Sequence, residues 1–251
     1  MMAILKPKWW LIGIGIPLAA ILAFVAWGLF VPAPMAQALD AMQPDYEVLV
    51  TRDTWLVFQP ILSKPTTGFI IYPGGRVDPR AYAPQAKAIA AQGYLVVIVP
   101  MPLHLAVLGS DRAGEVIQSF PEIKHWVIGG HSLGGAMAAS YADQHPDQIE
   151  GLVLWAAYPA KSNNLSQTAL KVASLSASLD GLATPKKIEA SHTLLPASTT
   201  WLVIEGGNHA QFGWYGDQSG DHPATLSREE QQAQVIRATV KLLKAVNAIG
   251  K

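Results

Sequence analysis

The chain has 251 residues, with 18 lysines and arginines, 18 aspartates and glutamates, and a formal net charge of zero. A neutral chain lacks the basic surface that attracts phosphates, so nucleic acid is not an expected partner. The chain contains no cysteine, which excludes disulfides, thiolate metal sites and a cysteine nucleophile. Half of the residues are hydrophobic and 14% are charged, a composition typical of a folded chain rather than a disordered one.

The first feature along the chain is an apolar segment, residues 9–31, which contains no charged side chain. About 20 apolar residues span the hydrocarbon core of a bilayer. Because Lys6 and Lys8 precede the segment, the pattern predicts a cytoplasmic N-terminus (residues 1–8) and a single-pass transmembrane anchor over residues 9–31. The rest of the chain would then lie outside the cytoplasm, bound to the cell membrane through this helix.

A cleaved signal sequence is the alternative for the same segment. Ala36-Gln37-Ala38 is an acceptable cleavage site, and cleavage there would give a secreted protein. On both interpretations residues 32–44 form a linker, and residues 45–251 form one domain, because no repeat or second shift in composition divides them.

Short apolar runs and helical segments alternate along this domain. Alternating residues predict an antiparallel hairpin over residues 46–59. Apolar runs bounded by turn residues predict further strands over residues 68–72, 94–99, 125–128, 151–156, 172–178 and 200–204. Helices are expected over residues 80–92, 109–120, 133–145 and 184–191, and from a capping box at Ser227 to the C-terminal region. Strands that are apolar on both faces and alternate with helices indicate an α/β fold, with a mostly parallel central sheet and helices on both faces.

Residues 130–134 read Gly-His-Ser-Leu-Gly, which fits the pattern G-x-S-x-G. A strand precedes this block and a helix of small residues follows it, as a nucleophile elbow requires. Such a turn lifts the Ser132 hydroxyl above the sheet, and the Leu133 N–H points at the carbonyl oxygen under attack. We therefore predict Ser132 as a nucleophile, with an inert serine in a glycine-rich turn as the alternative. The turn should direct the His131 side chain away from Ser132.

The base and the acid of such a site follow the nucleophile along the chain, in loops at the C-terminal edge of the sheet. His209 follows the last strand directly and is the predicted base, with His222 in reserve. Asp180 follows the 172–178 strand and is the predicted acid, with Glu205 as the alternative. His209 would take the Ser132 proton and return it to the leaving group, while Asp180 holds the imidazole tautomer.

A second donor to the oxyanion is expected from the turn after the 68–72 strand, in Tyr72-Pro73-Gly74-Gly75. Gly75 is the first choice, with the Arg76 N–H close behind it. A plain turn between a strand and a helix is the alternative.

Together these blocks resemble the α/β-hydrolase superfamily, and within it the compact dienelactone-hydrolase-like and generic α/β hydrolases. The matching blocks are residues 72–82, 129–137, 180–184 and 205–213. The resemblance implies an α/β-hydrolase fold with a Ser-Asp-His triad. Because dienelactone hydrolases use a cysteine nucleophile, which is absent here, a serine esterase is the implied activity. The connection between Ala157 and Val172 is too short for a large cap domain.

The expected function is therefore that of a serine hydrolase, which cleaves carboxylic esters or related small-molecule acyl compounds through an acyl-enzyme, with no cofactor and no metal. Phe212, Trp214 and Tyr215 are candidate substrate-binding residues, although they could equally pack their own loop. Asp217 and Asp221 are expected to be solvated turn carboxylates. A non-catalytic binding protein with this fold and an acyltransferase stay open as alternatives.

Overall fold

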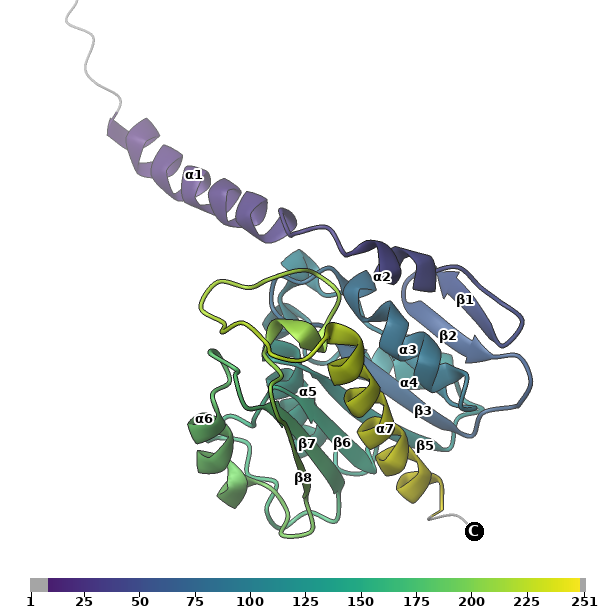
Figure 1. The fold of residues 1–251 in the computed structure, drawn as a ribbon. Helices are drawn as coiled ribbons and strands as arrows, with labels where there is room; N and C mark the ends of the chain where they lie inside the picture. Colours follow the sequence, from purple (N-terminus) through teal and green to yellow (C-terminus); the bar gives the residue numbers. More distant parts are fainter. Residues whose placement is uncertain (1–8, 249–251) are drawn as a thin grey trace, which may run out of the picture.

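The computed structural model describes residues 9–248 and the side chains of residues 16–248. Its centre is an eight-stranded sheet with the order β1-β2-β4-β3-β5-β6-β7-β8 (Figure 1). β2 runs antiparallel to β1 and β4, and every other neighbouring pair is parallel. The strands are β1 (Val48–Arg52), β2 (Leu56–Pro60), β3 (Thr67–Tyr72), β4 (Leu95–Ile98), β5 (His125–His131), β6 (Gly151–Trp155), β7 (Lys171–Ala177) and β8 (Thr200–Ile204).

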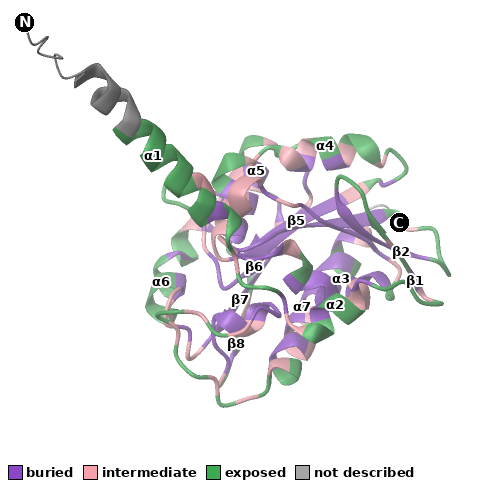
Figure 2. Ribbon diagram, turned by 90° about the horizontal axis from the view of Figure 1, so that it is seen from above, coloured by how far each residue is buried: buried purple, intermediate pink, exposed green. Residues whose placement is uncertain are grey.

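Helices cover both faces of the sheet. α3 (Ala83–Ala90) and α7 (Arg228–Asn247) pack on one face, and α4 (Arg112–Ser119) and α5 (Leu133–Gln144) pack on the other. Seen from above, buried strands lie between these two groups of helices (Figure 2). Successive residues of β3 alternate between the two cores, because side chains alternate along a strand. This burial on both faces explains the continuous apolar runs.

The strands and helices predicted from the sequence are present, with ends shifted by a few residues. The hairpin is β1–β2, and the predicted helix over residues 80–92 consists of a 3₁₀ turn, η1 (Pro79–Tyr82), followed by α3. α6 (Pro185–Ala190) follows β7, and Ser227 and Glu230 form the predicted capping box of α7. The connection between β6 and β7, residues 156–170, contains neither helix nor strand. The mostly parallel sheet covered on both faces is thus confirmed.

The uncharged N-terminal segment does not form the predicted transmembrane anchor. α1 runs from Trp9 to Leu29 and contains Pro17. Among the residues that the structure describes, no helix is both long enough and apolar enough to cross a membrane. The predicted single-pass location at the cell membrane, with the membrane as partner through this helix, is therefore wrong.

The predictions for the residues on either side of this segment had other outcomes. Residues 1–8, predicted as a cytoplasmic N-terminus, lie outside the described residues. Part of the predicted linker forms a short helix, α2 (Ala36–Ala41), which packs beside α3. Ala38, the predicted cleavage position, is fully buried there.

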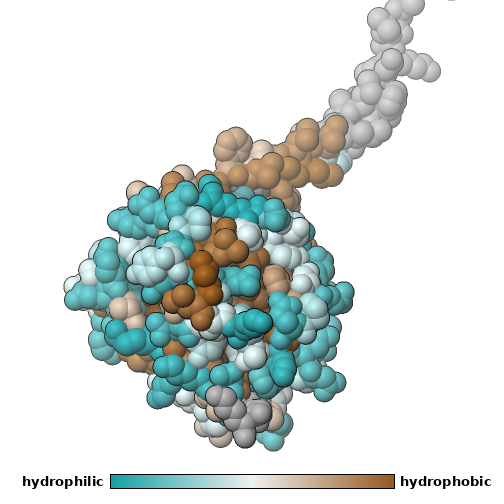
Figure 3. All heavy atoms as spheres, turned by 90° about the vertical axis from the view of Figure 1, so that its right-hand side faces the viewer, coloured by the Kyte–Doolittle hydropathy of each residue, from teal (hydrophilic) through white to brown (hydrophobic). Residues whose placement is uncertain are grey.

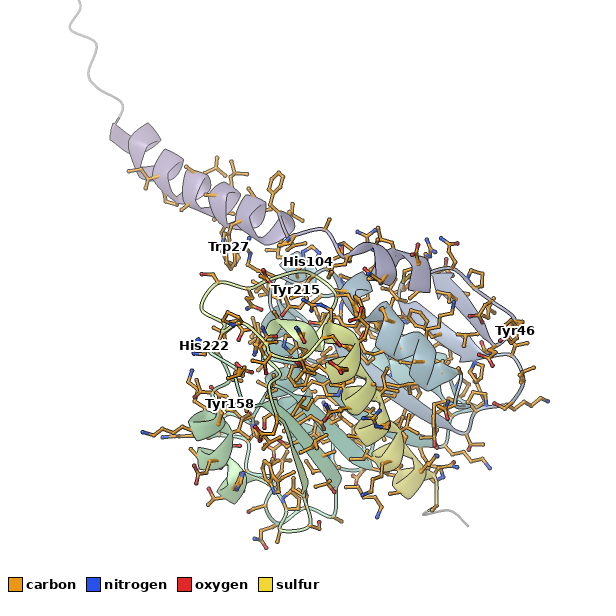
Figure 4. All side chains as sticks on the ribbon, viewed as in Figure 1. Trp27, Tyr46, His104, Tyr158, Tyr215 and His222 are labelled. Carbon is orange, nitrogen blue, oxygen red and sulfur yellow. The ribbon has the colours of Figure 1, made fainter. Side chains whose placement is uncertain are left out.

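The C-terminal end of α1 is attached to the domain. Gly28 lies against Leu103, where an added Cβ would come within 2.8 Å of the Leu103 Cβ, and the Gly28 carbonyl oxygen accepts a hydrogen bond from His104 Nδ1 at 3.0 Å. Trp27 and His104 both lie at this junction (Figure 4). Beyond it, the described apolar side chains of α1 are largely exposed. The face on the right-hand side of Figure 1 is mostly hydrophilic around a small apolar centre (Figure 3).

Candidate active site

The turn from β5 into α5 holds Ser132 in a strained conformation. Ser132 has φ 53° and ψ −122°, a region of backbone space that is essentially restricted to glycine. Its N–H donates to the Trp155 carbonyl oxygen at 3.0 Å, and its own carbonyl oxygen accepts from the Ala136 N–H at 3.1 Å. The two bonds fix the turn between β6 and the first turn of α5, and they leave the side chain half-exposed above the end of the sheet.

The glycines around Ser132 are required by close backbone contacts. A Cβ at Gly130 would lie 2.4 Å from the Tyr72 carbonyl oxygen, and a Cβ at Gly134 would lie 2.2 Å from the same atom. β5 and the start of α5 therefore approach the end of β3 more closely than any side chain permits. The G-x-S-x-G pattern has its expected structural context.

The predicted acid and base are in direct contact. His209 Nδ1 donates to Asp180 Oδ2 at 2.8 Å, and both side chains are almost completely buried. Asp180 Oδ1 accepts from the N–H groups of Leu182 and Ala183, each at 2.7 Å. His209 Nε2 is buried and has no hydrogen-bond partner among the described residues. Of the two imidazole nitrogens, one is thus bound by a carboxylate and the other is free to exchange a proton with a reacting group.

The alternatives to these two residues lie elsewhere. Glu205 is exposed, and His222 is exposed at the outside of its loop (Figure 4). The His222 carbonyl oxygen accepts from Asn208 Nδ2 at 2.8 Å. Neither side chain joins the Asp180–His209 pair.

His131 lies against the base, a contact that the sequence analysis missed. The centroids of the His131 and His209 rings are 4.4 Å apart. Tyr82 Oη lies 2.9 Å from His131 Nδ1 and accepts from the Gly74 N–H at 3.0 Å. The tyrosine proton is therefore donated to His131 Nδ1. Burial, and then the charge of His209, lowers the pKa of His131 well below 6.5, so the ring is neutral and carries its proton on Nε2.

The turn after β3 contains three successive amides beside the elbow, and two are occupied. The Gly74 N–H donates to Tyr82, and the Arg76 N–H donates to the His104 carbonyl oxygen at 2.8 Å. The Gly75 N–H has no acceptor among the described residues. A Cβ at Gly75 would lie 3.1 Å from Leu133 Cδ2, so this amide is next to the residue that begins α5. Of the two predicted choices, Gly75 has the available amide and Arg76 does not.

A pocket of about 290 Å³ opens beside Ser132. It is bounded by the start of α5, the loop after β6 and the loop after Asp180. Its walls are small or apolar apart from the hydroxyl groups of Ser132 and Tyr158, and none of them is charged. The lining residues are Ser132, Leu133, Ala136, Ala156, Ala157, Tyr158, Leu182 and Ala183.

The three predicted substrate-binding aromatics do not line this pocket. Phe212, Trp214 and Tyr215 are buried, with exposed fractions of 0%, 6% and 7%. The Phe212 ring stacks on His131 with centroids 5.8 Å apart, and the Tyr215 ring lies 6.2 Å from the same side chain. Phe212 and Tyr215 thus pack against His131, and the Trp214 ring lies 5.9 Å from the Arg228 guanidinium. Direct contact of the three with a substrate stays a prediction.

Comparisons with known proteins agree with this architecture. A family model described as the alpha/beta hydrolase family matches residues 68–233. A thermophilic esterase from Thermogutta terrifontis has a TM-score of 0.57 at 12% identity, over 83% of this chain and 96% of that chain. Ferulic-acid-bound Est1E from Butyrivibrio proteoclasticus has a TM-score of 0.58 at 11% identity, over 78% of this chain and 98% of that chain.

The esterase domain of a Rhodothermus marinus protein has a TM-score of 0.57 at 11% identity, over 74% of this chain and 90% of that chain. The comparison with curated proteins gives no match to this chain. At such low identities the structural likeness concerns the fold alone. The family match, however, covers more than half of the chain, and the elbow and the acid–base pair lie in the positions that this fold provides for them. The chain belongs to the alpha/beta hydrolase family.

Proposed function

We propose that the protein is a serine hydrolase that cleaves carboxylic esters or related acyl compounds through Ser132, Asp180 and His209. The observation that carries the proposal is the buried Asp180–His209 hydrogen bond of 2.8 Å beside a strained elbow. An inert serine has no need of a backbone conformation that costs about 1–3 kcal/mol, nor of a buried base with one unpartnered nitrogen.

The reaction follows from the roles of these groups. His209 Nε2 removes the Ser132 proton while Oγ attacks the acyl carbon, and the imidazolium then protonates the leaving alcohol. Water releases the acyl group by the same steps in reverse order, which regenerates the free serine. Asp180 keeps the Nδ1 proton in place and stabilises the imidazolium that forms between the two transfers.

Two backbone N–H groups are assigned to stabilise the negative charge that develops on the substrate oxygen. The Leu133 N–H lies at the start of α5, where it has no acceptor within the helix. The Gly75 N–H is the free amide of the facing turn. Pre-organised donors of this kind each contribute about 3–4 kcal/mol to stabilising the transition state in acyl-transfer enzymes.

The pocket beside Ser132 supports an uncharged acyl group of modest size. Four of its lining residues are alanines, and no lining side chain carries a charge. A carboxylate on the acyl chain would therefore be desolvated without a partner, which is strongly unfavourable. Neutral esters with short acyl chains are therefore the substrates that fit this pocket.

The proposal is tested with a fluorophosphonate probe and with p-nitrophenyl acetate and butyrate. We expect wild-type protein to hydrolyse the esters and to be labelled at Ser132, and we expect Ser132→Ala to lose both properties because the nucleophilic oxygen is gone. His209→Ala should lower kcat by several orders of magnitude, approaching about 10⁶-fold.

Ser140→Ala is the matched control, since Ser140 lies in the same helix but outside the pocket. It should be labelled like wild type. Equal labelling of wild type and Ser132→Ala would refute the assignment of the nucleophile, and near-normal turnover by His209→Ala would refute the assignment of the base.

A further inference from the structure

Asp221, which sequence analysis assigns to solvent, bridges the loops that carry the acid and the base. Its Oδ1 accepts from the Gly181 N–H at 3.0 Å, and its Oδ2 accepts from the Ala210 N–H at 2.8 Å. Gly181 directly follows Asp180, and Ala210 directly follows His209. One carboxylate thus binds the backbone of both loops at the residue next to each reacting side chain.

The amides of the acid loop are divided between two carboxylates. Those of Leu182 and Ala183 bind Asp180 Oδ1, whereas that of Gly181 binds Asp221. Asp180 Oδ2 is consequently reserved for His209. Hydrogen bonds to an ionised acceptor are roughly twice as strong as neutral ones, so the two bonds of Asp221 restrain the separation of the loops.

The residues on either side of Asp221 also contact the two loops, Gly220 the acid loop and His222 the base loop. A Cβ at Gly181 would lie 2.3 Å from the Gly220 carbonyl oxygen, so the backbones touch there. On the other side, the His222 carbonyl oxygen accepts from Asn208 Nδ2 at 2.8 Å. Three consecutive residues therefore lie across the acid loop and the base loop.

A half-buried arginine completes the restraint on the base loop. Arg228 Nη1 donates to the Ala210 carbonyl oxygen at 2.7 Å and also to the Gly213 carbonyl oxygen, and Nη2 donates to that of Gly216 at 3.3 Å. The residue that follows His209 is thus held through its N–H by an anion and through its carbonyl oxygen by a cation.

We infer that Asp221 is a positioning residue, which sets the Asp180–His209 geometry by joining the acid and base loops. The inference rests on the proposed serine hydrolase function. Asp221 does not reach the substrate pocket, so its loss should affect the proton transfers rather than substrate binding. A small misplacement of reacting groups costs up to about 100-fold in rate.

The experiment compares Asp221→Ala, which loses both hydrogen bonds, with Asp221→Asn, whose amide oxygen retains one acceptor. Asp217→Asn is the matched control, because Asp217 is an exposed carboxylate of the same loop. With p-nitrophenyl butyrate, we expect kcat to fall about 10- to 100-fold in Asp221→Ala and less in Asp221→Asn, with KM within about twofold of wild type. Asp217→Asn should behave as wild type.

Amide hydrogen exchange, followed by NMR, gives a readout that does not depend on activity. The Gly181 and Ala210 amides should be protected in the wild-type protein and should exchange faster in Asp221→Ala. If the wild-type amides are protected but the protein has no esterase activity, the proposed function is refuted, while the link that Asp221 makes between the two loops still stands. Unprotected amides, or a folded Asp221→Ala with wild-type kcat, would overturn the inference.

Discussion

His131 is a buried side chain whose charge state is set by its neighbours. It is 1% exposed, accepts the Tyr82 hydroxyl proton on Nδ1, and faces His209. A cation at this position would be desolvated and would repel the imidazolium that the proposed reaction forms on His209. The lowered pKa of His131 therefore suits a site in which only one of two adjacent histidines gains a proton.

We predict that His131 makes the folding stability fall at acidic pH. Its pKa in the folded protein lies well below 6.5, so below about pH 6.5 the unfolded chain binds a proton that the folded protein does not. The free energy of unfolding should then decrease as the pH falls from about 6.5 towards the lowered pKa, by up to about 1.4 kcal/mol per pH unit.

Urea unfolding at pH 7.5 and pH 5.5 measures this effect. Between these values His131→Asn should lose less stability than wild type, because asparagine does not titrate but can still accept from Tyr82. His222→Asn, at an exposed position, should retain the wild-type difference. Identical pH dependence in His131→Asn and wild type would contradict the prediction.

At the scale of elements, the strand-to-helix turn depends on how closely β5, α5 and the end of β3 approach one another. A Cβ at Gly134 would meet the carbonyl oxygens of Tyr72 and Pro73 at 2.2 and 2.3 Å. Those backbone atoms belong to the central sheet and to the turn that supplies the proposed oxyanion donor. Neither can move without disturbing the other.

We therefore expect Gly134→Ala to lower the free energy of unfolding by about 1–3 kcal/mol, as overpacking typically does. Gly114→Ala is the contrasting variant, because Gly114 lies inside α4 and its added Cβ would meet only Tyr141 Oη at 3.3 Å. There the gain in helix propensity of about 1 kcal/mol offsets the contact. Thermal unfolding compares the two, and equal destabilisation by both substitutions would contradict this explanation.

Element-scale patterns also explain which predictions succeeded. Strands β3 to β7 could be predicted because they are buried on both faces. The proximity of Asp180 and His209 could be anticipated because parallel strands end at one edge of the sheet. The contacts of Asp221 join residues 40 and 11 positions apart. A hydrogen bond to a backbone amide places no requirement on the type of the partner residue, so the local sequence holds no trace of this bridge.

At the scale of the whole molecule, the N-terminal segment is attached to loops that border the site. Arg76 Nη2 donates to the Phe30 carbonyl oxygen at 2.9 Å, and its guanidinium lies 4.3 Å from the centre of the Trp27 ring. Further along, the Met35 N–H donates to the Trp214 carbonyl oxygen at 2.8 Å. Hydropathy along residues 9–31 does not record the contacts of Trp27 and Phe30 with Arg76.

The backbone angles of Ser132 imply a trade between thermal tolerance and turnover. A serine at φ 53° and ψ −122° costs the folded domain about 1–3 kcal/mol, and glycine would relieve that cost at an entropic penalty of about 0.4–1 kcal/mol in the unfolded chain. We expect Ser132→Gly to melt about 2–4 °C above Ser132→Ala, since both lack the hydroxyl and only alanine keeps the strain.

Differential scanning calorimetry measures the melting temperatures of the two variants. A Ser132→Gly protein that melts at or below the temperature of Ser132→Ala would contradict this prediction. If the difference is found, the elbow conformation costs the folded domain stability with any side chain larger than hydrogen at position 132, which includes the serine. Selection for heat resistance alone would then tend to remove the proposed nucleophile.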